Sequence, residues 1–268
     1  MPPIIYGTAW KKERTTELVM QAFDAGFRGF DTACQPRHYA EELVGEALTQ
    51  LGKKGVARND YYLQTKYTPI SGQDLDTVPY DADAKLEDQV AQSFQVSLHN
   101  LNTSYLDGLI LHSPFAEFDE TLSAWYAMEM IQKQGGSKLL GISNCYDLGL
   151  LKKLYEQAEI KPRIVQNRFY EKSGYDVALR AWCIAKQISY QSFWTLTANQ
   201  HILKNSHVLQ LAAQYDKSPV QILFNYLKQR QVTPLTGTSS RDHMKMDLAS
   251  FDIEFSATEL SLIDNLWM

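Results

Sequence analysis

The sequence predicts a single-domain α/β protein, a closed (β/α)8 barrel (TIM barrel) over residues 1–268. Short apolar runs alternate with longer amphipathic runs along the whole chain, and eight such pairs are present. Alternating strands and helices indicate a parallel sheet, and 268 residues is a typical length for this barrel. An open doubly wound sheet is the alternative. The turn after the first expected strand reads Gly7-Thr8-Ala9-Trp10, however, which is not a glycine-rich dinucleotide fingerprint.

Four strand–helix pairs fill the first half of the chain. Apolar residues recur at helical spacing in the amphipathic runs, and glycine ends three of them, at Gly26, Gly52 and Gly135. The expected strands are residues 3–6, 28–32, 61–66 and 105–112, and the expected helices are residues 13–25, 41–51, 84–101 and 120–134.

The second half of the chain repeats this pattern with more helices. A long helical run is interrupted at Lys217, where Ser218 predicts a cap and Pro219 the first residue of a new helix. Either Ser256 or Thr258 is expected to cap the last helix. The expected strands are residues 139–142, 163–166, 188–193 and 232–236, and the expected helices are residues 148–158, 176–186, 207–229, 242–248 and 258–266.

Composition and charge exclude several classes of partner. The formal net charge is −5, so the chain lacks the basic field that attracts nucleic acids or anionic membranes. The three cysteines, Cys34, Cys145 and Cys183, lack CxxC spacing, so we expect neither disulfides nor a metal site. No signal-like segment or apolar run of membrane-spanning length is visible. We therefore expect a cytoplasmic protein, and we expect it to be a monomer or a weak homodimer.

Polar side chains close several of the expected strands. Asp31, Lys66 and His112 end the second, third and fourth strands, and Ser143-Asn144 and Gln166-Asn167 follow or end the fifth and sixth. Barrel enzymes draw their catalytic groups from these strand ends, which meet at one mouth. The sequence therefore predicts one site that contains these residues.

The residues at these positions form motifs that together resemble the aldo-keto reductase family. The motifs run in the family order and cover nearly the whole chain, which makes the resemblance specific although each motif alone is weak. They are Phe30-Asp31-Thr32-Ala33 followed by Tyr39, Glu42 and Val44 to Leu48, then Leu63 to Lys66, Tyr105 to Asp107 with Leu111-His112, Gly141 to Asn144, Val165 to Asn167, and Gly237 to Ser240.

The resemblance implies a catalytic set of Tyr39, Asp31, Lys66 and His112. Carbonyl reduction needs a hydride on carbon and a proton on oxygen, and Tyr39 would be the proton donor. A nearby ammonium favours the phenolate, so Lys66 is expected to lower the pKa of Tyr39 while Asp31 holds Lys66 in place. His112 would bind the substrate oxygen and orient the carbonyl.

The spacing of the tyrosine departs from the family pattern. Many members have it five residues after the aspartate, where this chain has Pro36, whereas Tyr39 lies eight residues on. An insertion in this loop restores the alignment, because Val44-Gly45 is also displaced. His38 in the same loop is the alternative proton donor.

The resemblance also implies a nicotinamide cofactor, NADPH first and NADH as a possibility. Ser143, Asn144 and Gln166 would surround the carboxamide, and Phe193 would stack on the ring, with Trp194 as the alternative. The turn after the eighth strand would bind phosphate through backbone amides and a helix N-terminus. Family members that prefer NADPH carry a lysine and an arginine where this chain has Gly237 and His243. Arg241 could replace one of them, Thr238 and Ser239 lie in the same turn, and Asp247 aligns with an adenine contact.

Aromatic residues are expected around the mouth of the barrel. Trp10, Tyr67, Phe115 and Trp194 follow strand ends, which suggests an apolar or aromatic carbonyl as the small-molecule substrate. Two other readings remain open. One is a barrel lyase or isomerase that uses Lys66 as a Schiff-base nucleophile, and the other is a reductase-like regulatory subunit that senses its cofactor.

Overall fold

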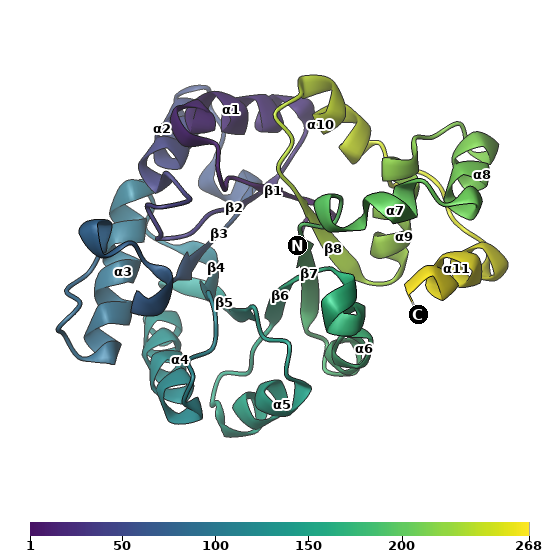
Figure 1. Cartoon of the computed structure of the whole chain (residues 1–268). Coiled ribbons are helices and arrows are strands. Elements are labelled where there is room, and N and C mark those ends of the chain that lie inside the picture. The colour runs from purple at the N-terminus through teal and green to yellow at the C-terminus, as the bar shows by residue number, and fades with distance from the viewer. Residues whose placement is uncertain (268) are drawn as a thin grey trace.

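Eight parallel strands close into a barrel in the computed structural model, which describes residues 1–267 (Figure 1). Each strand pairs with the next along the chain, and β1 pairs with β8 to complete the ring. The predicted barrel is confirmed, although Met268, the last residue of the predicted domain, lies outside the described residues. The strands are β1 (Ile5–Gly7), β2 (Gly29–Asp31), β3 (Tyr62–Tyr67), β4 (Leu106–Leu111), β5 (Ser137–Ser143), β6 (Ile164–Arg168), β7 (Ser189–Phe193) and β8 (Val232–Thr236).

Helices surround this ring of strands (Figure 1). Short 3-10 turns add to them between several elements. The helices are α1 (Thr15–Ala25), α2 (Glu41–Lys53), α3 (Leu86–Asn100), α4 (Phe118–Lys133), α5 (Leu148–Gln157), α6 (Val177–Ala185), α7 (Gln200–Leu203), α8 (Ser206–Gln214), α9 (Pro219–Gln229), α10 (Arg241–Leu248) and α11 (Ala257–Asp264).

The predicted capping residues begin two of these helices. Ser218 accepts a hydrogen bond from the backbone of Gln221, whose side chain bonds back to the Ser218 backbone, and Pro219 is the first residue of α9. Ser256 makes the same kind of capping box with Glu259, which settles the choice between Ser256 and Thr258. Local side-chain chemistry therefore divides the long run over residues 207–229 into α8 and α9, as predicted.

The structure differs from the sequence prediction at a few element boundaries. The helix expected over residues 176–186 begins at Val177, because Asp176 adopts a left-handed conformation with φ of 52°. The first strand is shifted to Ile5–Gly7, where its pairing with β2 and β8 lies. The short helix α7 lies in a segment that the sequence did not predict to be helical, just after the end of β7.

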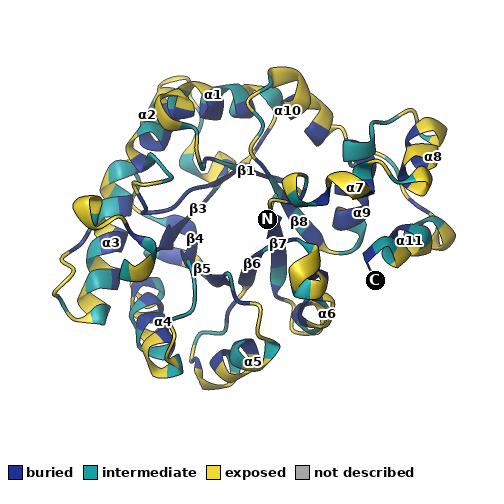
Figure 2. Cartoon of the chain, in the orientation of Figure 1, coloured by how far each residue is buried: buried dark blue, intermediate teal, exposed yellow. Residues whose placement is uncertain are grey.

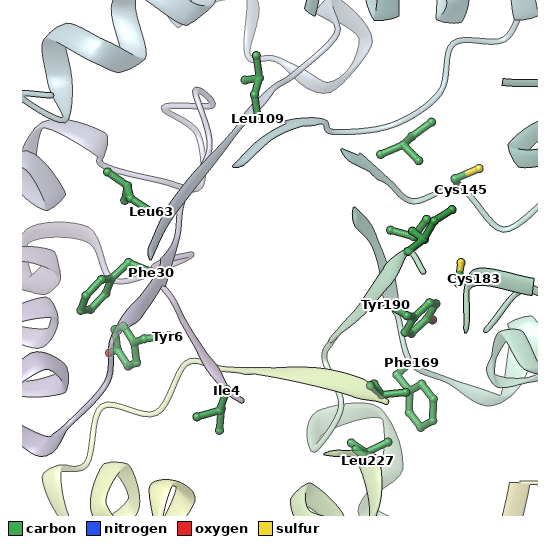
Figure 3. Close-up of a cluster of buried hydrophobic side chains, with 14 of the residues drawn as sticks. Ile4, Tyr6, Phe30, Leu63, Leu109, Cys145, Phe169, Cys183, Tyr190 and Leu227 are labelled. Carbon is green, nitrogen blue, oxygen red and sulfur yellow. The ribbon is translucent and has the colours of Figure 1, made fainter. Parts of the chain in front are cut away.

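Strand alternation separates an apolar outer layer from a polar barrel interior. Figure 3 shows Phe30, Leu63 and Tyr190 pointing away from the barrel axis towards the surrounding helices. Successive side chains of a strand point to opposite faces, so their neighbours point inward. Gln64 of β3 and Gln191 of β7 accordingly bond to each other across the barrel. Inward-facing polar side chains at the carboxyl ends of the strands therefore face the mouth of the barrel.

Most of the helices bury one face and leave the other face exposed (Figure 2). In α2 the buried residues Val44, Ala47, Leu48 and Leu51 recur at the spacing of a single helical stripe. Among residues 1–267, no helix combines the length and the apolar character that crossing a membrane requires.

Gly45 in α2 tests how tightly this outer layer is packed. A Cβ at this position would lie 1.9 Å from the carbonyl oxygen of Asn100, at the end of α3, so backbone would have to move. We expect Gly45→Ala to lower the free energy of unfolding by about 2 kcal/mol or more, measured by urea denaturation. Gly52→Ala in the same helix is the matched control, because a Cβ there meets nothing within 4 Å. It should stabilise the protein by up to about 1 kcal/mol; equal effects of the two variants would contradict this account.

Candidate active site

A cavity of about 900 Å³ opens at the carboxyl ends of the strands. Its wall comes from the segments after β1, β2, β4, β5, β6, β7 and β8, so residues far apart in the sequence meet there. Most of the predicted site residues line it: Trp10, Asp31, Tyr39, His112, Ser143, Asn144, Gln166, Phe193, Trp194, Gly237, Thr238, His243 and Asp247.

A buried ion pair forms the floor of this cavity. The Lys66 ammonium donates to both carboxylate oxygens of Asp31 at 2.7 Å and to the carbonyl oxygen of Thr32 at 2.8 Å. Lys66 is 1% exposed and Asp31 is 3% exposed. An ammonium has three N–H donors, so these three acceptors occupy all of them. Burial lowers the pKa of Lys66, and the adjacent Asp31 carboxylate opposes that shift.

Side-chain amides of the barrel interior also bind the Asp31 carboxylate. Gln64 and Gln166 donate to its Oδ1 at 2.7 and 2.9 Å. Both amides donate in addition to the Oε1 of Gln191, at 2.8 and 2.9 Å. Hydrogen bonds from Lys66 and two amides thus satisfy a carboxylate that would be costly to bury alone. The sequence analysis missed Gln64 and Gln191, because isolated amides inside strand patterns carry no distinctive signal.

Tyr39 lies directly above the ion pair. The backbone N–H of Tyr39 donates to the carbonyl of Gln35 at 3.0 Å. This hydrogen bond closes a turn within the loop that is longer here than in the family pattern. The ring centroid lies 5.2 Å from the Lys66 Nζ and 6.2 Å from the His112 ring centroid. The structure therefore brings together the four predicted catalytic residues despite the unusual spacing in the sequence.

The pKa of Tyr39 is shifted in the opposite direction to the one expected from the sequence. Burial raises it above its ordinary value, and the charge of Asp31 raises it further. The physical reason is that burial penalises the charged phenolate and the neighbouring Asp31 carboxylate repels it. Tyr39 is accordingly held as a neutral phenol.

His112 lies beside Tyr39 at the end of β4. Its Nδ1 is 2.7 Å from the hydroxyl of Thr68, and its backbone N–H donates to the carbonyl of Tyr67. Burial, followed by the charge of Lys66, holds the pKa of His112 well below its usual range. The ring is therefore a neutral imidazole whose Nδ1 already has a partner.

His38, the alternative proton donor, also lines the cavity. Its Nδ1 is 2.9 Å from the Oε1 of Gln35, and its ring centroid lies 4.0 Å from that of Trp10. Burial lowers the pKa of His38, and the neighbouring Arg37 lowers it further. Both candidates thus share one cavity, but only Tyr39 stands over the Lys66–Asp31 pair.

Ser143, Asn144 and Gln166 lie together on one wall. The Ser143 hydroxyl donates to the Gln166 carbonyl at 2.6 Å, and the Asn144 amide donates to the His112 carbonyl at 2.9 Å. Asn144 adopts φ of 53°, a left-handed conformation that asparagine tolerates better than most residues. The Nε2 of Gln166 is bound to Asp31 and Gln191, which leaves its Oε1 as the acceptor for a ligand.

Two of the residues predicted to bind the cofactor at the turn after β8 lie outside the cavity lining. Ser239 and Arg241 are exposed and do not line the cavity. The cation at this turn is instead Lys11, whose ammonium donates to the carbonyl of Gly237 and which lines the cavity. Lys11 has no signal in the sequence that links it to Gly237, 226 residues away.

The α10 helix begins at the same turn. Ser240 caps it by accepting a hydrogen bond from the backbone of His243. Asp247 lies on its buried face and accepts from the Thr236 hydroxyl at 2.8 Å. Burial raises the pKa of Asp247 to about 6.

Two of the four aromatic residues predicted at the mouth lie there. Trp10 and Trp194 line the cavity and are 62% and 50% exposed. Tyr67 does not line it; its ring is buried against Tyr80, and its hydroxyl donates to Gln89. Phe115 packs against the hydrophobic core. The outward-facing position of Tyr67 in β3 follows from strand alternation, because the inward-facing Lys66 precedes it.

Glu41 is a buried acid behind this site. It begins α2, is 3% exposed, and accepts hydrogen bonds from the hydroxyls of Thr65 and Ser97. Burial raises its pKa from the ordinary 4.5 to about 7. The carboxyl group therefore gains a proton within the physiological range only in the folded protein.

Comparisons with known proteins identify the relatives of this chain. The family model described as "Aldo/keto reductase family" matches residues 3–170. Relatives include the glyoxal reductase of Bacillus subtilis, 29% identical over 252 residues that cover 94% of this chain and 83% of that protein. Another is aldo-keto reductase family 1 member A1-A of Danio rerio, 25% identical with coverage of 99% and 86%.

Solved structures share the fold. An aldo-keto reductase from a deep-sea metagenome library superposes with a TM-score of 0.85 at 24% identity, covering 99% of this chain and 91% of that one. A Bombyx mori aldo-keto reductase solved in complex with NADP gives a TM-score of 0.81 at 23% identity, with coverage of 99% and 89%.

The raised pKa of Glu41 predicts a pH-dependent stability. Between pH 4.5 and about 7 the folded state binds this proton more tightly than the unfolded state, so stability falls as pH rises through that range. We expect Glu41→Gln to remove this fall, which amounts to about 3 kcal/mol at most. Urea unfolding at pH 5 and pH 8 measures it, with the exposed neighbour Glu42→Gln as control. Parallel stability curves for Glu41→Gln and the unsubstituted protein would refute this assignment.

Proposed function

Because the chain belongs to the aldo/keto reductase family, we propose that it is an NAD(P)H-dependent enzyme that reduces an aldehyde or ketone to an alcohol, with Tyr39 as general acid. The observation that carries this proposal is that the four predicted catalytic side chains meet at one cavity floor. The Lys66–Asp31 pair lies lowest, Tyr39 lies 5.2 Å above its ammonium, and the His112 ring lies beside Tyr39.

The cavity has the groups that a dinucleotide needs at its two ends. At one end the free Oε1 of Gln166 and the polar groups of Ser143 and Asn144 match a carboxamide. At the other end Lys11 and the N-terminus of α10 match phosphate. We propose NADPH, with NADH as the alternative, because Lys11 supplies a cation where the turn itself carries glycine. The bound reduced nicotinamide supplies the hydride.

The protonation state of Tyr39 suits the donation of a proton. Its raised pKa keeps the phenol protonated at neutral pH. The alkoxide that forms when a carbonyl carbon receives hydride is far more basic than a phenolate, so proton transfer to it is downhill. The ammonium of Lys66 then lies close to the phenolate that remains.

His112 is the proposed second donor to the substrate oxygen. When the Thr68 hydroxyl donates to Nδ1, the single proton of the neutral ring lies on Nε2. That N–H is positioned to hold the carbonyl oxygen next to Tyr39, and its hydrogen bond strengthens as negative charge develops. Trp10 and Trp194 offer exposed aromatic faces on the cavity wall, which supports an apolar or aromatic substrate.

The lyase or isomerase alternative needs Lys66 as an accessible, unprotonated amine. Lys66 is 1% exposed and its three donors are bound, which makes it a poor nucleophile. The regulatory-subunit alternative differs only in lacking turnover, so a measurement of turnover decides between it and the proposal.

Tyr39→Phe tests the proposed acid. The change removes only the hydroxyl, so we expect at least a 100-fold loss of kcat for aldehyde reduction, within the usual size of about 10²–10⁴ for general acid catalysis. NADPH affinity, followed by fluorescence titration, should change by about threefold at most, because Tyr39 lies with the floor groups rather than at the phosphate end. His38→Gln is the companion variant and should lower kcat far less. A larger loss of kcat in His38→Gln than in Tyr39→Phe would identify His38 as the proton donor.

A further inference from the structure

Arg168 is a cationic side chain of the cavity wall that the proposed reaction does not use. It is the last residue of β6 and is half-buried. Alternation along the strand places it on the same inward face as Gln166, one step closer to the mouth. The two Cα atoms are therefore about 6.6 Å apart along the barrel wall.

Aromatic rings hold the Arg168 guanidinium in place. It lies 4.1 Å from the ring centroid of Trp194, 5.5 Å from that of Tyr170 and 6.0 Å from that of Phe193. Its backbone N–H donates to the Tyr146 hydroxyl at 3.2 Å. A guanidinium stacked in this way keeps its N–H edges free for bidentate binding of an oxyanion.

The charge of Arg168 is unbalanced in the part of the chain that the structure describes. No carboxylate of residues 1–267 forms a salt bridge with it, and its buried Nε has no hydrogen-bond partner there. The two carboxylates of the cavity wall are already engaged, Asp31 by Lys66 and Asp247 by the hydroxyl of Thr236. A partly buried, unpaired cation of this kind favours an anionic ligand.

We propose that Arg168 binds a carboxylate of the substrate, so that the substrate class is a carbonyl compound carrying an anionic group. This inference rests on the proposed reductase function. With the carbonyl between Tyr39 and His112, the carboxylate would lie against Arg168 on the β6 side of the cavity. Trp194 would then cover the apolar part between the two groups.

Strand order assigns this anion to the substrate rather than to cofactor phosphate. The groups proposed to bind the cofactor phosphates, Lys11 and the N-terminus of α10, lie next to β1 and β8. Arg168 lies on β6 next to β7, two strands away from β8, beside Gln166 and Phe193. It therefore flanks the carboxamide end of the cavity.

The test compares 4-formylbenzoate with its neutral methyl ester. The two aldehydes share the same ring and formyl group, and only the first carries an anionic carboxylate. We expect the protein to favour the acid in kcat/KM. Arg168→Met should lower the ratio of acid to ester by roughly 10- to 100-fold, the usual size for losing a hydrogen bond to a charged group. Arg168→Lys should recover part of the ratio, because it keeps the charge and loses the bidentate fork.

Arg163→Met is the matched control, because Arg163 is exposed and directly precedes β6, at the end opposite to Arg168. It removes the same charge and should leave the ratio unchanged. An unchanged ratio in Arg168→Met would overturn the proposal, as would a weakened NADPH affinity that accounts for the whole effect.

A binding measurement keeps the inference separate from the proposed function. Quenching of tryptophan fluorescence by 4-(hydroxymethyl)benzoate should be at least tenfold weaker in Arg168→Met than in the unsubstituted protein, and this comparison needs no turnover. Failure to reduce either aldehyde would refute the reductase function alone. Equal binding of the acid by both proteins would refute the carboxylate site alone.

Discussion

The buried ion pair between Lys66 and Asp31 is the interaction on which the rest of the site depends. Two buried charges are costly unless their geometry and hydrogen bonding are nearly complete. Here each partner is saturated: the ammonium has three acceptors, and the carboxylate also binds the amides of Gln64 and Gln166. Losing either partner would leave an uncompensated charge inside the barrel, with a typical cost of 3–5 kcal/mol.

The charges of the ion pair also act on the groups above it. Burial and the charge of Asp31 raise the pKa of Tyr39, so the phenol stays neutral and keeps the proton that a reduction consumes. His112 is likewise neutral, since burial and the charge of Lys66 lower its pKa. The cavity therefore holds two neutral hydrogen-bond donors over a buried ion pair. Such an arrangement is organised in advance for negative charge on a substrate oxygen.

Much of this could be predicted from the sequence, for a physical reason. Strand ends of a parallel barrel meet at one mouth, so polar residues that close apolar runs, such as Asp31, Lys66 and His112, had to converge. The caps Ser218 and Ser256 were predictable because their hydrogen bonds are local. The predictions that failed concern the direction in which a side chain points. Tyr67 ends β3 but faces outward, and Phe115 follows β4 but packs on the core.

Other features could not be predicted from the sequence because they join segments that lie far apart along the chain. Lys11 meets Gly237 only when β1 closes on β8, and the bonds of Gln64 to Gln191 cross the barrel. The direction of the Tyr39 pKa shift depends on how far the phenol is buried and how near the Asp31 carboxylate lies, which no sequence pattern records. The most direct test is a titration of Tyr39 by NMR of ring-labelled tyrosine, assigned with Tyr39→Phe. The account predicts that Tyr39 remains protonated beyond the ordinary tyrosine pKa of about 10. A phenolate that forms at neutral pH would contradict it.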